Sequence, residues 1–472
     1  MSIPGLSLPG ISQNPSQALE PAPAAPRLQS LAAETEYRFE CASLVTIKLL
    51  TGTAELFGTE LSPNTPYTFK GTKAAIYTWQ GCNLEIIGDT EGEYVAEETP
   101  MVQYANTHFA LDNLRHEAKS KAELGPRILI VGPENSGKTS LVKMLTAYAL
   151  KSDWQPAVVN LDPRQGMMTV PGALSSTTFA SLLDVEEGWG SSPISGPSAL
   201  PVKMPLAYHF GCSTAEENPK LYKALVTRLA LAVTGRMDDD EEVKPSGVFI
   251  DTPGSISSGK GNNYDLIQHI ASEFSVTAIL VIGAERLFNE MKRRFSSTSS
   301  PDSVTVVRLD KSGGCVDRDE AYMKTMRQQQ IREYFFGHGS VNLSPYTNQV
   351  EFAHLSIYHI IDSNAASNSF DPGLDDDDDI YDPAAKSGQS TGTLYEKVTP
   401  SLMLQNSLLA VTYAEASESQ DMIRDASVMG YVYAIDVDET KRRVKLLGPV
   451  SGRLPNKAMI WGNFPEEVID LV

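Results

Sequence analysis

Cysteine is scarce in this chain. Only four occur among 472 residues, and they lie far apart without a C-x-x-C pair, at Cys41, Cys82, Cys212 and Cys315. This spacing excludes the common structural zinc motifs and does not match the disulfide framework of a small secreted domain. We therefore expect reduced thiols in a cytosolic or nuclear protein.

Long apolar runs are also missing. No uninterrupted stretch approaches the roughly 20 apolar residues that a membrane-spanning helix needs, so we expect no membrane contact. Residues 1–30 are rich in Pro, Ser, Gln and Ala and lack the continuous apolar segment of a signal peptide. Their composition predicts a disordered tail instead.

Positive charge is in deficit. The chain has 39 Lys and Arg against 59 Asp and Glu, which gives a net charge of −20. A protein that wraps nucleic acid by electrostatics alone has the opposite balance. Any contact with RNA is therefore expected to be local or to be made by a partner.

The first hundred residues have the pattern of short strands. From Leu31 to about Tyr94, runs such as TEYRFE, SLVTIKLL and AAIYTW are separated at close spacing by turn residues such as Gly52 and Gly71. Several short strands with such turns predict a small β-sandwich. A helix is predicted to follow at Ala110–Glu123.

Strand and helix patterns alternate from about Pro126. Helix-like runs include Lys220–Thr234 and Asn263–Phe274. The strand candidates are Arg127–Val131, Ala157–Leu161, Val248–Asp251, Val276–Ile282 and Ser303–Arg308. This alternation predicts a doubly wound parallel sheet with its ligand at the carboxyl ends of the strands.

After about Gly337 the pattern is β-like again. The strand-like stretches are Val350–Ile361, Leu408–Tyr413, Gly430–Asp436 and Arg443–Leu447. They are interrupted by an acidic segment rich in Gly, Ser and Pro, residues 371–392. Its aspartate run, Asp375–Asp379, predicts a solvated loop rather than a metal site.

The most specific motif is GPENSGKTS, Gly132–Ser140, which follows the apolar run ILIV and precedes a helix-like run. Strand, glycine loop and helix in this order are the context of a P-loop, whose backbone N–H groups converge on a polyphosphate. Lys138 is then expected to reach the β- and γ-phosphates and Thr139 to hold Mg²⁺. The sequence therefore predicts binding of a nucleoside triphosphate.

A phosphoryl-transfer site also needs a carboxylate near the Mg²⁺ and the attacking group. Asp162 ends the strand in VVNLDPRQG and is a candidate for contacting Mg²⁺ through water or for activating a substrate hydroxyl; a strand-end Asp that caps a turn is the alternative. A second strand end, FIDTPGS, resembles the switch motif of GTPases. The guanine-reading Asn-Lys-x-Asp motif is missing, because Asn456–Lys457 is followed by Ala-Met, and this disfavours a GTPase.

A local basic segment, ERLFNEMKRR, spans Glu285–Arg294. Its Arg286, Arg293 and Arg294 are candidates for a mobile lid over the phosphates. An ordinary solvated helix face explains the same pattern equally well.

Together these motifs resemble the Clp family, which comprises polynucleotide 5′-hydroxyl kinases and mRNA 3′-end cleavage factor subunits. The resemblance covers nearly the whole chain from Leu31 to Val472. Further segments that carry it are AELFGTELSPN, AAIYTWQGC, TPMVQYANTH, VPGAL, YHFG, IREYFFG and LPNKA. It implies an α/β multidomain protein with an N-terminal β-sandwich (31–118), a central P-loop domain (119–337) and a small C-terminal mixed α/β domain (338–472).

The resemblance also implies roles for individual residues. In the family a Glu and a Lys of the N-terminal domain grip the adenine end of ATP, and the matching segments ETEYRFE and TKAAIYTW point to Glu36 and Lys73. The resemblance strengthens the assignment of Mg²⁺ to Thr139 and Asp162, and of the lid to the arginines. The phosphates are expected to contact Asn135, Ser136, Gly137, Lys138, Thr139 and Ser140.

Two segments depart from the family's catalytic pattern. Catalytic members typically carry Asp-x-Gly-Gln where residues 162–165 are DPRQ, and Thr-x-Gly-Trp where residues 252–255 are TPGS. Arg164 then puts a bulky cation beside the expected site of the RNA end, and the missing tryptophan removes an aromatic platform for stacking. In these respects the chain resembles the fungal-type members, in which ATP is a structural ligand.

The favoured hypothesis is a nuclear ATP-binding subunit of the pre-mRNA 3′-end cleavage and polyadenylation machinery. It would use ATP structurally, bind the large scaffold subunit and other cleavage factor subunits, and contact RNA through these partners. The alternative is an active polynucleotide 5′-hydroxyl kinase. Asp162 would then activate the 5′-OH, Lys138 and Mg²⁺ would bear the γ-phosphate charge, Arg286 or Arg293 would stabilise the transition state, and Trp189 is a conceivable replacement platform.

Overall fold

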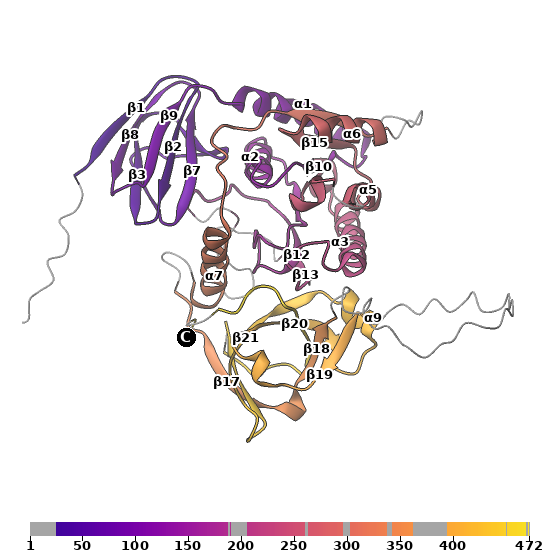
Figure 1. Cartoon of the computed structure of the whole chain (residues 1–472). Coiled ribbons are helices and arrows are strands. Elements are labelled where there is room, and N and C mark those ends of the chain that lie inside the picture. Colours follow the sequence, from indigo (N-terminus) through magenta and orange to yellow (C-terminus); the bar gives the residue numbers. More distant parts are fainter. Residues whose placement is uncertain are drawn as a thin grey trace, which may run out of the picture.

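The computed structural model describes residues 25–186, 189, 205–259, 263–295, 303–337, 342–361, 394–449, 451–468 and 471. An N-terminal β-sandwich lies beside a central α/β domain, and a C-terminal sheet lies below the central domain in the view of Figure 1. Within these residues no helix is both long and apolar enough to cross a membrane.

The predicted β-sandwich is confirmed and consists of two antiparallel sheets. One has the order β1-β8-β3-β6 and the other β5-β4-β7-β2-β9. Their strands are β1 (Arg27–Leu31), β2 (Thr35–Cys41), β3 (Val45–Gly52), β4 (Glu55–Leu56), β5 (Thr59–Glu60), β6 (Pro66–Phe69), β7 (Thr72–Thr78), β8 (Cys82–Ile87) and β9 (Gly92–Ala96). Alternate residues such as Ile47, Leu84 and Phe39 are buried between the sheets in a core of their own.

Strand β1 corrects the predicted tail. The sequence predicted that residues 27–30 belong to the disordered tail. They are instead part of β1, which pairs with β8 from Arg27 opposite Ile86 to Leu31 opposite Cys82. Leu31 is buried and anchors the strand in the sandwich core. Residues 1–24 lie outside the described part of the chain.

One long helix, α1 (Met101–Lys121), leads from the sandwich to the central domain. The predicted helix is confirmed in kind but begins at Met101 rather than Ala110. The additional turns are held by tertiary contacts, because Tyr104 is buried and its hydroxyl donates to the carbonyl of Asp310 over 2.6 Å. Further along, the buried Arg115 donates through Nε to the carbonyl of Ser246 over 2.9 Å.

The central sheet has the order β13-β12-β11-β14-β10-β15-β16. The five predicted strands are present and parallel, as β10 (Arg127–Val131), β11 (Ala157–Asn160), β14 (Val248–Asp251), β15 (Ala278–Ile282) and β16 (Thr305–Leu309). The sheet is mixed rather than wholly parallel, because β12 (Ala173–Thr178) and β13 (Leu206–His209) extend one edge in antiparallel pairing. Their sequences, ALSSTT and LAYH, lack the apolar run that indicates a buried strand.

Helices cover both faces of this sheet. Ile128 and Ile130 of β10 pack on the side of α1 and α2, whereas Leu129 and Val131 pack on the side of α3 and α5. The helices are α2 (Lys138–Lys151), α3 (Pro219–Asp239), α4 (Val243–Ser246), α5 (Asn263–Glu273), α6 (Glu285–Phe295) and α7 (Glu320–Phe336). The P-loop thus lies where β10 ends and α2 begins, at the carboxyl edge of the sheet.

The C-terminal domain is a seven-stranded sheet of order β17-β22-β21-β20-β23-β18-β19. It comprises β17 (Tyr346–Glu351), β18 (Ser356–Ile360), β19 (Tyr395–Val398), β20 (Leu408–Glu415), β21 (Val428–Asp438), β22 (Arg443–Gly448) and β23 (Lys457–Trp461). The predicted mixed α/β domain is therefore mainly β where it is described, with one six-residue helix, α9 (Gln420–Asp425). The acidic segment 371–392 lies outside the described residues.

Candidate functional site

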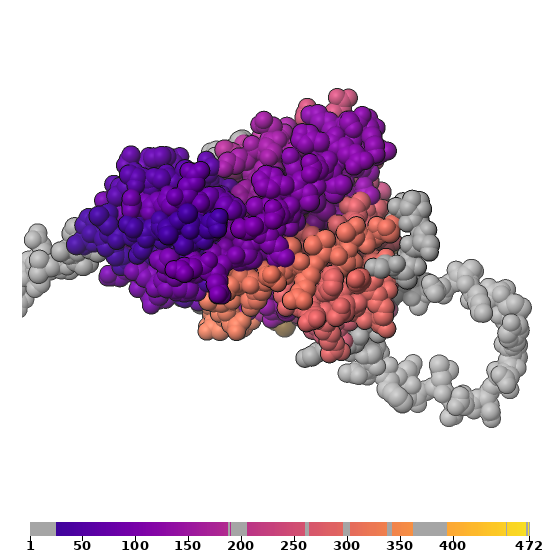
Figure 2. All heavy atoms as spheres, turned by 90° about the horizontal axis from the view of Figure 1, so that it is seen from above, coloured from indigo at the N-terminus to yellow at the C-terminus, as the bar shows by residue number. Residues whose placement is uncertain are grey.

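A cavity of about 480 Å³ lies between the β-sandwich and the central domain. Figure 2 shows these two bodies side by side, the sandwich in indigo and the central domain in magenta to orange. Strands β2 and β7, the P-loop and the segment between β16 and α7 all contribute to its lining. Its volume is that of a pocket for a small-molecule ligand or cofactor.

The P-loop forms the predicted strand, loop and helix. Asn135 and Gly137 adopt left-handed backbone conformations, with φ of 53° and 89°. A Cβ on Gly132 would lie only 2.7 Å from Ser136 Oγ, so a larger residue at this position would displace that hydroxyl. The turn directs backbone N–H groups and the start of α2 at the cavity, an arrangement that attracts anions.

Two buried polar groups of the loop fit an anionic ligand. Lys138 is buried, and its Nζ donates to the carbonyl of Pro133 over 2.9 Å. Burial lowers the pKa of Lys138, and the negative charges of Asp251 and Asp162 oppose this shift. Ser136 Oγ is buried and has no hydrogen-bond partner among the described residues. Such groups are satisfied when a phosphate enters.

A cluster of hydrogen-bonded polar side chains includes Thr139, the residue that follows Lys138. Thr139 Oγ1 donates to Asp251 Oδ2 over 2.5 Å and lies 3.4 Å from Gln165 Oε1. Gln165 in turn donates through Nε2 to Asp162 Oδ2 over 3.0 Å. The cluster therefore gathers the two predicted Mg²⁺ residues, Thr139 and Asp162, and adds a second carboxylate.

Asp251 belongs to a strand end that the sequence reasoning considered but to which it assigned no role. It ends β14, the neighbour of β10, and is 1% exposed. Burial raises its pKa to about 6, with the Asp162 charge adding to the rise and Lys138 and Thr139 opposing it. The signal was its place at the end of the apolar strand in FIDTPGS, which was weighed only as a GTPase switch.

The residues expected at the adenine end line the same cavity as the P-loop. Glu36 on β2 is buried and paired with Arg38, whose Nε lies 2.7 Å from Glu36 Oε2. Lys73 on β7 is paired with Glu40 over 2.5 Å, and its Nζ lies 5.0 Å from the centre of the Tyr322 ring. The structure therefore brings Glu36, Lys73 and residues 135–140 together around one space.

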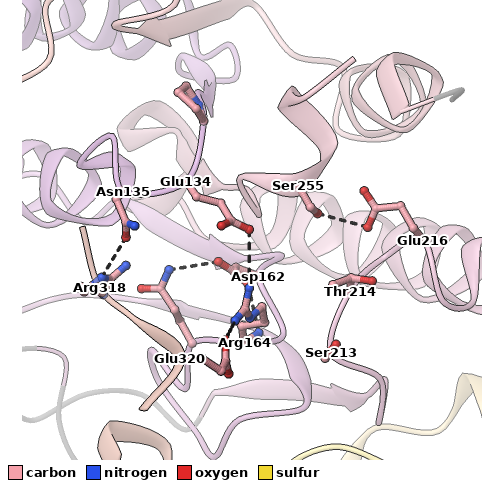
Figure 3. Close-up of polar contacts among 12 residues, drawn as sticks. Glu134, Asn135, Asp162, Arg164, Ser213, Thr214, Glu216, Ser255, Arg318 and Glu320 are labelled. Atoms are coloured by element: carbon pink, nitrogen blue, oxygen red, sulfur yellow. Dashed lines mark hydrogen bonds and ion pairs between the residues drawn. The ribbon is translucent and has the colours of Figure 1, made fainter. Parts of the chain in front are cut away.

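Arg164, which the family resemblance places beside the expected site of the RNA end (the acceptor side), also lines the cavity (Figure 3). Its guanidinium lies between two carboxylates, 3.5 Å from Glu134 Oε1 of the P-loop and paired with Glu320 at the start of α7. Its backbone N–H donates to Asp162 Oδ1 over 3.0 Å. The arginine is thus held in place from both sides.

The segment TPGS packs directly on the P-loop. A Cβ on Gly254 would lie 2.5 Å from the backbone nitrogen of Glu134, so only glycine allows this approach. Ser255, at the position of the family's tryptophan, donates through Oγ to Glu216 over 3.1 Å (Figure 3). This part of the acceptor side is therefore polar and partly acidic.

The predicted lid arginines are elsewhere. Arg286 and Arg293 line a shallow depression of their own on α6, and Arg293 is paired with Glu290 over 2.8 Å. Leu287 and Met291 form the buried face of α6, which turns the arginines outward. In this structure neither Arg286 nor Arg293 lines the cavity of the P-loop, whereas Arg318, which was not singled out, does.

Comparison with known proteins covers all three domains. Residues 30–118 match the family model "N-terminal beta-sandwich domain of polyadenylation factor". Residues 132–337 match "mRNA cleavage and polyadenylation factor CLP1 P-loop". Residues 343–466 match "Pre-mRNA cleavage complex II protein Clp1".

Individual relatives match over the full length. The chain is 52% identical over 476 residues to the mRNA cleavage and polyadenylation factor CLP1 of Phaeosphaeria nodorum, with 100% of both chains covered. It is also 52% identical to the protein of that name from Botryotinia fuckeliana, over 99% of this chain and 100% of the relative.

A solved structure of a Clp1p–Pcf11p complex has 29% identity and a TM-score of 0.81, covering 93% of this chain and 98% of the other. A second has the same values and is described as showing an extended Pcf11p–Clp1p interface and the basis of ATP loss in a glycine-to-arginine point mutant. The sequence matches along the full chain and the fold over 93% of it, and the chain belongs to the Clp1 family of mRNA cleavage and polyadenylation factors.

Proposed function

We propose that this protein is a non-catalytic ATP-binding subunit of the mRNA 3′-end cleavage and polyadenylation machinery, in which ATP joins the β-sandwich to the P-loop domain. One observation carries the proposal. The residues expected to hold ATP line one cavity, while the acceptor side of that cavity contains Arg164, fixed between Glu134 and Glu320. The site thus favours holding a nucleotide over passing its phosphate to a polynucleotide.

The residues fit ATP from end to end. Glu36 and Lys73 would contact the adenine end, and residues 135–140 with Lys138 would contact the phosphates. Thr139 and the carboxylates of Asp162 and Asp251 would hold Mg²⁺, directly or through water. Bound in this way, Mg²⁺–ATP would contact the β-sandwich through its adenine end and the P-loop domain through its phosphates.

Its binding free energy would then stabilise the joined domains. A ligand that binds only the assembled form stabilises it by RT ln(1 + [L]/Kd), about 4 kcal/mol when ATP exceeds Kd a thousandfold. That is a large share of the 5–15 kcal/mol typical of a folded domain. ATP without turnover is therefore sufficient to keep this junction closed.

The partner is proposed from the relatives. The similar solved structures are complexes of Clp1p with Pcf11p. We propose that this chain binds the corresponding scaffold subunit, that it works in the nucleus, and that RNA is contacted through partners. The chain's net charge of −20 supports the last point, because it opposes a general grip on RNA.

The test is the Lys138→Ala variant. We expect it to lose the ATP-dependent rise in melting temperature and to bind a recombinant scaffold subunit more weakly in a pull-down. Lys441→Ala is the matched control, because Lys441 has 75% of its side chain exposed on the C-terminal sheet. Unchanged melting and pull-down for Lys138→Ala would refute the structural role of ATP.

An active polynucleotide 5′-hydroxyl kinase remains the second candidate, favoured by one observation. Asp162 lines the cavity together with Lys138 and Thr139, where it would activate a hydroxyl. Trp189, the conceivable replacement platform, packs instead on Phe179, with ring centroids 5.3 Å apart. We expect no transfer of labelled γ-phosphate from ATP to a 5′-hydroxyl RNA; transfer that disappears with Lys138→Ala would establish the kinase.

A further inference from the structure

Strand β9 ends one sheet of the β-sandwich. In the order β5-β4-β7-β2-β9 it pairs with β2 on one side, and no other described strand pairs with its outer edge. Four of its five residues are exposed. Two of these are large and apolar, Tyr94 with 51% and Val95 with 40% of the residue exposed. An open strand edge that carries apolar side chains can accept a further strand from another chain.

A surface groove of about 760 Å³ continues from this strand. It is lined by residues 94–100 and, on the central domain, by Asp310, Lys311 and Gly313. Arg38 also lines the groove and holds its β9 side in place. Its Nη1 donates to the Tyr94 hydroxyl over 3.4 Å, and its Nη2 donates to the carbonyl of Glu98 over 3.3 Å. The open strand edge is therefore continuous with a groove whose wall is fixed from within.

The charge around β9 is negative. Residues 89–98 contain five carboxylates and no lysine or arginine. Glu97 and Glu98 are both exposed, and the side chain of neither forms an ion pair with a described residue. The groove is lined by three carboxylates and two cations, and one of these cations, Arg38, is already paired with Glu36. The excess of negative charge therefore favours a positively charged partner.

Charged residues on an edge strand commonly protect it from unwanted pairing. Here the unpaired charges stand outside the strand, because Glu91 precedes β9 and Glu97 and Glu98 follow it. The one charge within β9 is Glu93, which is paired with Arg27 over 2.5 Å. The last three residues of the strand, YVA, are uncharged. This distribution leaves the edge itself open and places the charge where it can select a partner.

We propose that the edge of β9 and the groove beside it bind a basic, extended segment of a partner protein, which adds to the β-sandwich as a further strand. Backbone hydrogen bonds hold the segment, its apolar side chains contact Tyr94 and Val95, and its Lys or Arg side chains pair with Glu97 and Glu98. Nucleic acid is disfavoured, because its phosphates would meet the same carboxylates. The inference goes beyond the proposed function, since strand pairing at β9 does not require a nucleotide.

The experiment measures binding of a fluorescently labelled peptide of alternating lysine and valine to the full chain by anisotropy. A peptide with glutamate in place of lysine and a single-stranded RNA are the comparison probes. We expect the basic peptide to bind, more weakly as salt is raised, and the other two probes not to bind. The double variant Glu97→Lys/Glu98→Lys should weaken binding of the basic peptide about 10-fold, because like charges then oppose each other. Val95→Ser should weaken it about 3-fold through the lost side-chain contact.

The matched control is Glu241→Lys/Glu242→Lys, because these two adjacent glutamates are also exposed but lie before α4 on the central domain. It should bind the basic peptide like the unaltered chain. Amide hydrogen exchange locates the site, and the peptide should protect residues 92–98. Equal weakening by the control and by Glu97→Lys/Glu98→Lys would mean a general attraction to an acidic chain and would overturn the proposal. Tighter binding of the RNA, self-association of the chain through β9, or protection confined to other residues would overturn it as well.

Discussion

The central domain has two junctions, and they are built differently. Toward the β-sandwich it presents a cavity of about 480 Å³ lined by charged groups, and the sandwich keeps a hydrophobic core of its own. Toward the C-terminal sheet, one hydrophobic core continues from the central helices into that sheet.

Aromatic side chains fill the C-terminal junction. Tyr431 of β21 lies 5.9 Å from His209 of β13 and 5.8 Å from Tyr334 of α7, measured between ring centroids. The backbone N–H of Tyr431 donates to the Tyr334 hydroxyl over 2.9 Å. Nearby, a Cβ on Gly462 would lie 2.3 Å from the carbonyl oxygen of Gly211, so the two backbones touch.

The difference shows where a ligand is needed. The C-terminal junction is stabilised mainly by buried apolar area. The N-terminal junction has the buried charged groups Lys138, Asp162 and Glu36 around its cavity, and such groups are costly until they are fully paired. A nucleotide supplies the missing partners, so the stability of the two junctions should respond differently to ATP.

The largest effect on stability is expected from removing a core side chain at the C-terminal junction. Tyr431→Ala should lower the free energy of unfolding by about 3–5 kcal/mol, as for other large aromatic residues in a core. The loss should be the same with and without ATP, measured by urea denaturation. Tyr413→Ala, with 55% of the residue exposed on β20, is the control and should change little. A loss that ATP reverses would mean that the two junctions are not independent.

Acid is expected to weaken the same junction through His209. Burial lowers its pKa to about 4, and its ring nitrogens have no partner among the described residues. The folded state then binds fewer protons than the unfolded state, so the stabilisation is complete above pH 6.5 and is lost toward pH 4, about 3 kcal/mol in all. His209→Asn should lack this component of the pH dependence. The free energy of unfolding is measured by urea denaturation at pH 4.5 and pH 7. An equal change between the two pH values in the unaltered chain and in His209→Asn would contradict the prediction.

The P-loop side of the cavity should show the opposite sign of pH dependence, through Asp251, which accepts a hydrogen bond from the lining residue Thr139. The pKa of Asp251 is raised to about 6, so without nucleotide its contribution is full below pH 3.8 and is lost as pH rises through 6. The change is again about 3 kcal/mol. Asp251→Asn should therefore be more stable than the unaltered chain at pH 7 without ATP, as read from melting temperature. Asp251→Asn melting below the unaltered chain under these conditions would refute this account.

The smallest effect is expected at the acceptor side. Glu320 pairs with Arg164 and Arg327, but 65% of its side chain is exposed. Glu320→Gln should cost about 1 kcal/mol, because Glu320 is exposed and the buried Arg327 keeps its pair with Glu466. It should leave ATP affinity unchanged. Glu117→Gln on α1, another exposed pair, is the control. A large loss of ATP affinity would mean that Arg164 and Glu320 support the nucleotide rather than only occupy the acceptor side.

Elements with a strong local pattern were predicted well. The five parallel strands and the loop at 132–140 follow from contiguous apolar runs and one motif. The antiparallel strands β12 and β13 were not predicted, because β12 buries serine and threonine rather than an apolar run, and β13 has only four residues, LAYH. The early start of α1 was missed for a similar reason, since Tyr104 is held by a contact with Asp310 and not by helix periodicity.

By itself the sequence determined the local chemistry: a polyphosphate loop, an excess of negative charge, a β-sandwich before it and a sheet after it. These depend on neighbouring residues and on composition. Only the tertiary structure decided which distant charges meet. It paired Arg164 with Glu134 and Glu320, and it brought Arg318 to Asn135 across 183 positions while α6 turned its arginines outward. The reason is that such meetings depend on the packing of whole elements, which no single segment encodes.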